Sequence, residues 1–179
     1  MQTWIALLRG INVGGATVVP MKELISLFEK CNLHDIKTYI QSGNVVFRTE
    51  EGVTSLSKHI KNVLDQNLAF HPKLLLRTVE QLQEAAEANP FPQGEADPKS
   101  LHLYFLSEPP KNRDLDGLTQ LKKKSESFAI IGSTFYLHAP DGIGRSKLAA
   151  QVERHVGVDA TARNWRTVCK VLEMAQQTS

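Results

Sequence analysis

Strand-like and helix-like apolar patterns alternate along the first 79 residues in an order that few folds accommodate. Short apolar runs typical of strands cover residues 3–8, 36–41, 44–48 and 73–77. Apolar side chains at helical spacing follow Pro20, and a second helical stripe runs from residue 56 to residue 68. The order is therefore strand, helix, strand, strand, helix, strand, which is that of the ferredoxin-like α/β plait.

The second half of the chain repeats most of this order. A capping-box sequence at residues 78–81 predicts a connecting helix, and three prolines within residues 89–98 indicate a linker or a long loop. Strands are predicted at residues 101–106, 128–131 and 135–138, and helices at residues 113–121 and 146–156. The last predicted element is a helix from residue 161 to about residue 175, where a fourth strand would complete the second plait.

The predicted fold class is therefore α+β, with two tandem ferredoxin-like (alpha-beta plait) domains and an extra C-terminal helix. The first domain is expected to span residues 1–79. The second is expected to span residues 80–179 and to include the connecting helix and the proline-rich loop.

The composition is that of an ordinary globular chain. Its 179 residues are 41% hydrophobic and 22% charged, and the formal net charge is +2. This charge is too small to indicate a nucleic-acid-binding protein by itself. It is unevenly distributed, however, because residues 143–170 hold six basic residues and two acidic ones. The distribution of charge therefore indicates more than its sum.

No targeting or membrane segment is predicted. Arg9 and Asn12 interrupt the only early apolar run, and no apolar stretch has the length of a transmembrane helix. Cys31 and Cys169 fall at apolar positions of predicted helices, which favours two buried thiols over a disulfide. We therefore expect a soluble, cytoplasmic protein with no membrane partner.

Four short blocks are rich in Arg, Lys, Asn, Gln, Ser and Gly and contain no Asp, Glu, His or Cys. They are LLRGINVGG (residues 7–15), TYIQSGNVVF (residues 38–47), GRSKL (residues 144–148) and TARNWRTV (residues 161–168). Such side chains hold anions, but they neither transfer protons near neutral pH nor ligate transition metals. The blocks therefore predict an anion-binding site, with no metal and no cofactor.

The two N-terminal blocks also have structural interpretations. The glycines of residues 10–15 suit either a wide turn or a ligand-binding loop, with Arg9 placed to meet an anion. Their spacing matches neither the dinucleotide-binding fingerprint nor the P-loop. The dipeptide Ser42-Gly43 predicts a two-residue hairpin turn, flanked by the amides of Gln41 and Asn44, which suit base recognition as well as turn stabilisation.

Cations are concentrated in the two C-terminal blocks. Ser146 is a natural helix N-cap, and Arg145 and Lys147 beside it oppose the helix dipole at a cost of roughly 0.3–1 kcal/mol each unless an anion is bound. Spacings of three and four on the last predicted helix place one cationic ridge at Arg163, Arg166 and Lys170. That ridge is either a solvated face or part of the ligand site. His102 and Tyr104 alternate along a strand and are expected on a half-exposed face of the sheet.

The blocks, together with PMKEL at residues 20–24, closely resemble the bacterial family known as domain of unknown function 1697, from Leu7 to about Met174. This resemblance implies two ferredoxin-like plaits and no known catalytic residue. The chain departs from the family's usual glycine at Cys31-Asn32-Leu33, where Asn also tolerates a left-handed backbone. The family's motif residues correspond here to Arg9, Gly10, Asn12, Gly14, Gly15, Gln41, Ser42, Gly43, Asn44, Arg145, Ser146, Lys147, Arg163, Asn164, Trp165 and Thr167.

The sequence favours a binding module for a phosphate-bearing ligand, either a nucleic acid or a nucleotide. The predicted ligand-binding residues are Arg9, Asn12, Gln41, Ser42, Asn44, Arg145, Ser146, Lys147, Arg163, Asn164 and Arg166. One alternative is an enzyme acting on a small anionic metabolite, with Glu23 or His102 brought to the site by folding. Another is a protein-interaction module whose motif residues only brace the structure. The sequence leaves open whether the chain is an enzyme, its ligand and its oligomeric state.

Overall fold

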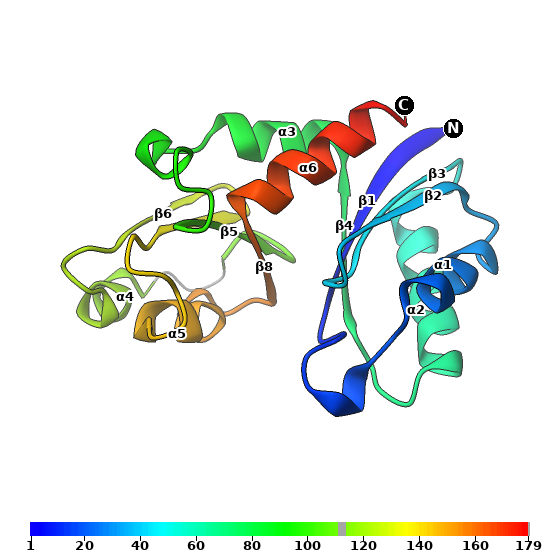
Figure 1. Cartoon of the computed structure of the whole chain (residues 1–179), viewed down its shortest axis with the longest axis horizontal. Coiled ribbons are helices and arrows are strands. Elements are labelled where there is room, and N and C mark those ends of the chain that lie inside the picture. The colour runs from blue at the N-terminus through cyan, green and yellow to red at the C-terminus, as the bar shows by residue number, and fades with distance from the viewer. Residues whose placement is uncertain (111–113, 179) are drawn as a thin grey trace. The chain divides into compact units, whose positions relative to one another are not determined.

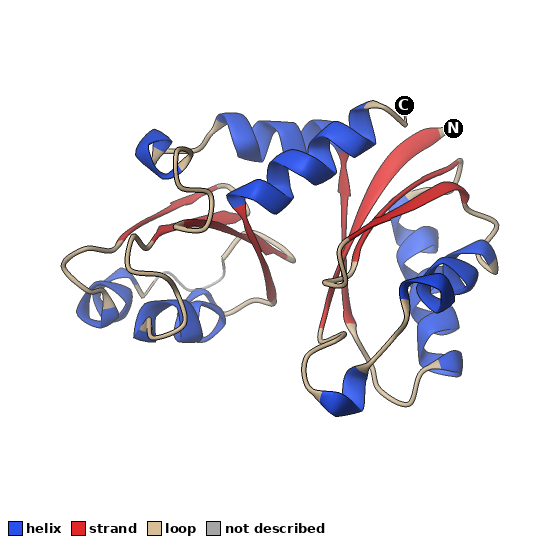
Figure 2. Cartoon of the chain, viewed as in Figure 1, coloured by secondary structure: helices blue, strands red, loops and turns tan. Residues whose placement is uncertain are grey.

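The chain folds into helices and two four-stranded antiparallel sheets in the part that the computed structural model describes, residues 1–110 and 114–178. Figure 2 shows these helices and strands. The chain divides into two compact units, one of Met1–Gln83 with Lys170–Ser179 and one of Glu84–Cys169. The α+β class predicted from the sequence is confirmed.

The sheet of the first unit has the strand order β2-β3-β1-β4, with neighbouring strands antiparallel. From the N-terminus the elements are β1 (Gln2–Arg9), the 3-10 helix η1 (Gly15–Thr17), α1 (Met21–Glu29), β2 (His34–Tyr39), β3 (Asn44–Thr49), α2 (Val53–Asn67) and β4 (Lys73–Thr78), followed by α3 (Val79–Glu87), within which the two units meet along the chain. All four strands predicted for residues 1–79 are present, and none of their ends is displaced by more than two residues. Asn32, between α1 and β2, has the expected left-handed backbone, with φ of 52°.

Alternation along β1 builds the core of this unit. Trp4, Ala6 and Leu8 point to the side of the sheet on which α1 and α2 lie (Figure 1) and belong to one buried apolar cluster with residues of both helices. Phe28 on α1 and Phe47 on β3 meet edge to face, with ring centroids 5.6 Å apart. Full burial of each such side chain stabilises the fold by roughly 1.5–3 kcal/mol. This packing fixes the two helices against one face of the sheet.

The sheet of the second unit has the order β6-β7-β5-β8, again antiparallel. The elements that follow α3 are the 3-10 helix η2 (Pro92–Gly94), β5 (Leu101–Leu106), α4 (Leu115–Leu121), β6 (Ser127–Ile131), β7 (Thr134–His138), α5 (Lys147–Val156), β8 (Ala160–Asn164) and α6 (Trp165–Gln176). The helices α4 and α5 lie on one face of this sheet (Figure 1) and pack on it through Leu118, Leu148 and Val152. Arg113, where the first of these helices was predicted to start, lies outside the described residues.

The predicted last helix is wrong at its start, because residues 160–164 form strand β8. This strand pairs with β5 from Ala160 to Asn164 and supplies the fourth strand of the second sheet. Pairing with a distant strand outweighs the local helical spacing of the cations. Arg163 is therefore on a strand, while Arg166 and Lys170 are on α6, so the predicted cationic ridge does not form.

With β8 in place, the two halves of the chain have the same order of described strands and α-helices and the same strand order. Arg77 on β4 and Arg163 on β8 occupy equivalent positions, and each guanidinium donates to the carbonyl of the preceding residue, at 2.9 and 2.8 Å. Burial lowers the pKa of both groups. The next residues, Thr78 and Asn164, accept a backbone N–H at the start of α3 and of α6. The two halves therefore share these contacts as well as their order of elements.

The proline-rich segment of residues 89–98 is a loop packed within the second unit. The Phe91 ring stacks on His138, with centroids 6.2 Å apart. Gly94 is buried, and a Cβ there would lie 2.9 Å from the Leu101 Cβ. These contacts order the loop, as expected of a long loop and not of a free linker.

The cysteines differ from each other in exposure. Cys31 is buried, as predicted, and burial raises the pKa of its thiol to about 11. Cys169 is exposed, so the prediction of a second buried thiol is wrong. Neither forms a disulfide. Among the described residues, no helix combines the length and the apolar character needed to cross a membrane.

Thr78→Ala is expected to lower the free energy of unfolding by about 1 kcal/mol, because it removes the side-chain acceptor for the Gln81 N–H at the start of α3. Asn164→Ala should have a similar effect, because it removes the acceptor for the Thr167 N–H at the start of α6. Urea denaturation followed by circular dichroism measures both changes. Thr54→Ala, at an exposed position of α2, is the control. Equal stability of the Thr78 and Thr54 variants would contradict the capping role.

Candidate functional site

The two N-terminal blocks meet at one end of the first sheet. The Asn12 side chain donates to the carbonyl oxygens of Val19 and Gln41, at 3.1 and 2.8 Å, and accepts the Val19 N–H at 2.8 Å. The Leu8 N–H donates to the Gly43 carbonyl at 2.8 Å. Asn12 therefore closes the loop that follows β1 and joins it to the turn between β2 and β3.

The turn between β2 and β3 is longer than predicted. Tyr39 pairs with Asn44, so residues 40–43 form a four-residue turn and the predicted two-residue hairpin is wrong. The Asn44 amide donates to the Tyr39 carbonyl and to Ser42 Oγ, at 3.1 and 2.8 Å. Ile40 and Gly43 both have positive φ, at 49° and 75°. The tight approach of this turn to β1, and not the turn type alone, accounts for the glycine.

This end of the first unit uses most of its polar groups internally. Both amide hydrogens of Asn12 and of Asn44 are donated to neighbours, and the N–H groups of Asn12 and Val13 bond to Thr17. Arg9 and the Gln41 side chain are exposed. The N-terminal blocks therefore form a braced loop and turn, with fewer donors for an anion than their composition suggested.

The start of α5 carries the GRSKL block in the second unit. Ser146 caps the helix, since its Oγ accepts the Ala149 N–H at 3.0 Å. This confirms the predicted N-cap. The N–H groups of Lys147 and Leu148 have no acceptor among the described residues. Arg145 and Lys147 are exposed. Free N–H groups and two cations therefore share one helix end, which is a suitable arrangement for an anion.

The TARNWRTV block follows α5 and begins on strand β8, where successive side chains point to opposite faces of the sheet. Ala162 pairs with Tyr104, which faces α5, so Arg163 points to the opposite face, where burial lowers its pKa to about 10. Asn164 shares the α5 side and accepts the Thr167 N–H at 2.9 Å. The exposed Arg166 lies on α6. Of the block's residues on β8, Asn164 is therefore the one that is on the α5 face and at the C-terminal end of the strand.

Two residues of β5 underlie the start of α5. Tyr104 donates its hydroxyl to the Ala149 carbonyl at 3.4 Å, which places the ring directly beneath the helix. His102 lies two residues earlier on the same face, opposite Asn164. Both side chains are 7% exposed, so the expectation of a half-exposed face is wrong. His102 Nδ1 has no hydrogen-bond partner among the described residues, and burial lowers the pKa of this imidazole.

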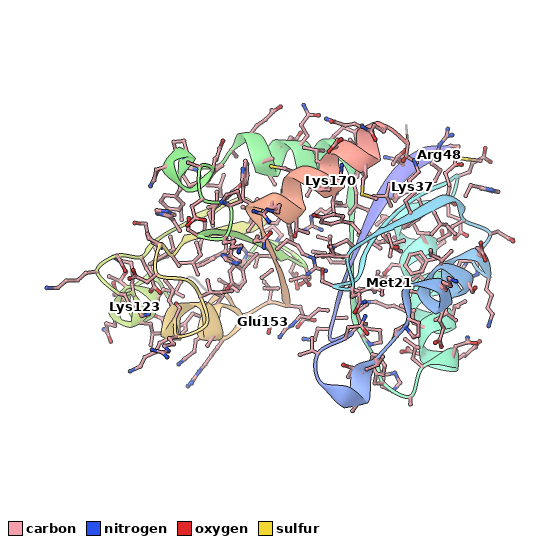
Figure 3. The ribbon with its side chains drawn as sticks, viewed as in Figure 1. Met21, Lys37, Arg48, Lys123, Glu153 and Lys170 are labelled. Atoms are coloured by element: carbon pink, nitrogen blue, oxygen red, sulfur yellow. The ribbon has the colours of Figure 1, made fainter. Side chains whose placement is uncertain are left out.

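The turn between α4 and β6 holds a buried carboxylate that the sequence did not indicate. Glu126 is 1% exposed, and its Oε2 accepts the Lys123 N–H at 2.9 Å, while Oε1 has no partner among the described residues. Lys122 Nζ donates to the Glu126 carbonyl at 2.9 Å, so this lysine stabilises the turn. Figure 3 labels Lys123 in this turn after α4. The run KKKSES around Glu126 gives no local signal of burial.

A protein-family model described as "Protein of unknown function (DUF1697)" matches residues 1–136. The chain belongs to this family. The membership that the sequence blocks predicted is thereby confirmed, and the matched residues of the DUF1697 chain include both N-terminal blocks and Glu126, while the GRSKL and TARNWRTV blocks lie beyond them.

One solved structure, described as a conserved bacterial protein from Streptococcus pneumoniae, is similar to this DUF1697 chain, with a TM-score of 0.74. The two are 23% identical, and the likeness covers 97% of this chain and 98% of that chain. At this identity the similarity shows a shared fold and nothing about ligands. No curated protein matches the chain.

Gly43→Ala is expected to destabilise the protein by about 1–3 kcal/mol more than Gly132→Ala. Both glycines have positive φ, at 75° and 55°, so alanine carries a backbone cost at each position. A Cβ at Gly43 would lie 2.7 Å from the Leu8 Cβ and 2.9 Å from the Ile11 Cδ1, whereas a Cβ at Gly132 meets nothing within 4 Å. Urea denaturation of both variants measures the difference. Equal losses would show that the turn does not pack on β1.

His102→Gln is expected to weaken the fall in stability on acidification. Because burial lowers the folded pKa of His102 below its unfolded value of about 6.5, the neutral imidazole stabilises the fold above that pH, and this contribution is lost as pH falls toward the folded pKa. Urea midpoints from pH 7.5 to pH 5 measure the effect. His34→Gln, on the exposed part of β2, controls for removal of a histidine. An unchanged pH profile for His102→Gln would contradict the burial argument.

Proposed function

We propose that this chain is a binding module for a phosphate-bearing ligand, a nucleotide or a nucleic acid, and that the phosphate binds at the start of α5. The observation that carries the proposal is the placement of Arg145 and Lys147 beside the free N–H groups of Lys147 and Leu148. Without an anion, each cation opposes the helix dipole at a cost of roughly 0.3–1 kcal/mol. A bound phosphate reverses the sign of that interaction, and the N–H groups supply hydrogen bonds to it.

Several polar side chains of the motif blocks are engaged in hydrogen bonds within the protein, which reduces the number of residues that we propose to bind the ligand. Asn12, Asn44, Ser146 and Asn164 each make a hydrogen bond that holds a loop or a helix end. Arg9, Gln41 and Arg166 are exposed. We therefore assign the phosphate to Arg145, Lys147 and the first N–H groups of α5, with the other motif residues shaping the surrounding loops.

We also propose that both units are ferredoxin-like plaits. The element order of each unit and the strand orders β2-β3-β1-β4 and β6-β7-β5-β8 support this assignment. Other plait proteins bind RNA on the open face of the sheet through aromatic side chains, but that is an analogy of fold. The site proposed here is at a helix start, so it depends on charge and on N–H groups instead of on stacking.

An enzyme acting on a small anionic metabolite is the second candidate. It is favoured by His102 and Glu126, two buried titratable groups at the same end of the second sheet. A buried imidazole and a buried carboxylate are groups that transfer protons in catalytic sites. In this alternative the start of α5 would hold the substrate's phosphate or carboxylate.

The double variant Arg145→Gln/Lys147→Gln is expected to lose about 10- to 100-fold in affinity for the phosphate-bearing ligand, because two charge-assisted contacts are removed. Thermal shift and calorimetric titration with inorganic phosphate, AMP and single-stranded RNA measure the loss. A ligand at about 100 times its Kd adds about 2.7 kcal/mol to the stability of the folded protein. The double variant Lys58→Gln/Lys61→Gln, which removes the same charge from exposed positions of α2, is the matched control.

The ligands also separate the candidate functions. RNA affinity that falls steeply with salt, with a smaller slope in the α5 variant, would support nucleic-acid binding. Binding of AMP alone would favour a nucleotide site or an enzyme. The proposal fails if no phosphate compound binds, or if the α2 control loses as much affinity as the α5 variant.

A further inference from the structure

Two buried polar atoms without partners lie at the same end of the second sheet. Among the described residues they are His102 Nδ1 and Glu126 Oε1. Glu126 is 1% exposed and His102 is 7% exposed, so bulk water does not satisfy either side chain. Buried polar groups are normally hydrogen-bonded, and a buried unpaired carboxylate oxygen is among the most unfavourable exceptions. Both atoms therefore call for a partner that the polypeptide itself does not supply.

The Glu126 turn is tied to the loop that enters α5. Ser125 Oγ donates to Asp141 Oδ2 at 2.6 Å, which joins the turn to residues 139–146. The Glu126 carboxylate acts electrostatically on Tyr104, whose pKa is raised to about 12 by burial and by this charge. Tyr104 in turn bonds to the Ala149 carbonyl in the first turn of α5. Glu126 immediately precedes β6, whose first residue, Ser127, pairs with His138 at the end of β7, so Glu126 lies at the end of the sheet from which the chain enters α5.

His102 extends the same polar region along β5. It shares the α5 face with Tyr104 and lies opposite Asn164, where β8 ends. Strands β7 and β8 are each antiparallel to β5 and are therefore parallel to each other. Helix α5 connects the end of β7 to the start of β8, so it runs antiparallel to both strands. The start of α5 therefore lies over the end of the sheet that carries His102. An acceptor, an imidazole and a helix start are gathered at one end of one unit.

The loop that enters α5 has open space beside its glycines, because a Cβ built on Gly142 or on Gly144 would meet nothing within 4 Å. Ile143, between them, packs against the apolar cluster of the second unit. A ligand that contacts Glu126 would therefore have to displace the loop at its glycines while Ile143 keeps its packing.

We propose that the phosphate site at the start of α5 continues inward to Glu126 and His102, and that its ligand is a phosphorylated sugar, free or within a nucleotide. This inference rests on the proposed function. The Glu126 Oε1 atom can accept a hydrogen bond, and a hydroxyl group of a ligand is a suitable donor to it. Carboxylates hold ribose hydroxyls in this way in dinucleotide-binding folds. A ligand with a phosphate at one end and neighbouring hydroxyls at the other satisfies both parts of the site.

The test compares inorganic phosphate with ribose 5-phosphate by calorimetry, in the full chain and in Glu126→Gln. Wild-type protein is expected to bind ribose 5-phosphate at least 10-fold more tightly than inorganic phosphate. Glu126→Gln should remove most of that preference and change the affinity for inorganic phosphate less than twofold. Asp116→Asn, at an exposed position of α4, is the matched control and should keep the preference.

Two further ligands distinguish the source of the sugar. AMP and 2′-deoxy-AMP carry the same phosphate and base and differ by one hydroxyl. Tighter binding of AMP than of ribose 5-phosphate assigns the site to nucleotides, and the reverse order assigns it to free sugar phosphates. Equal affinity of wild-type protein for AMP, 2′-deoxy-AMP, ribose 5-phosphate and inorganic phosphate overturns the inference.

A wild-type measurement keeps the test valid if Glu126→Gln does not fold. Ribose 5-phosphate should shift the NMR signals of the His102 and Tyr104 rings, whereas inorganic phosphate should shift only the amides at the start of α5. Phosphate binding that depends on Arg145 and Lys147, with no ring shifts and no effect of Glu126→Gln, overturns this inference and leaves the proposed function standing. Absence of any phosphate binding overturns both.

Discussion

Pairing of one central strand on both of its edges is the constraint on which each unit depends. In the first unit β1 bonds to β3 and β4, and in the second β5 bonds to β7 and β8. Because these strands have no free edge, their backbone groups are satisfied throughout and their alternating side chains are fixed to one face or the other. The helices then pack on the apolar face. The loops and helix starts at the ends of the sheet, where the motif blocks lie, take their positions from this frame.

The two pairs of motif blocks have different chemistry despite similar composition. Near β1, the side-chain amides of Asn12 and Asn44 donate their hydrogen bonds within the loop and the turn, so these residues stabilise the local backbone. Near α5, Ser146 and Asn164 are used in this way, whereas Arg145 and Lys147 are exposed and the N–H groups of Lys147 and Leu148 have no acceptor among the described residues. Composition predicted polar sites in both places. The hydrogen-bond pattern, and not the composition, separates the residues that brace a loop from those that we propose as ligand-binding.

Features encoded locally were predictable from the sequence, and features created by distant contacts were not. The Thr78 capping box and the Ser146 N-cap depend on neighbours three residues away, and both are present. Strand β8 exists because β5 offers it an edge, which the spacing of Arg163 and Arg166 could not reveal. Burial of Glu126 depends on the fold around it, so the charged segment in which it lies gave no sign of a buried carboxylate.

Assignment of the ligand site to the start of α5 is tested most directly by mapping amide chemical-shift changes in ¹⁵N-labelled protein during titration with AMP. The account predicts that the largest changes fall on the amides of residues 145–149, where the free N–H groups of Lys147 and Leu148 receive the phosphate. Changes confined to residues 10–18, between β1 and α1, would contradict it and return the site to the loop that Asn12 braces.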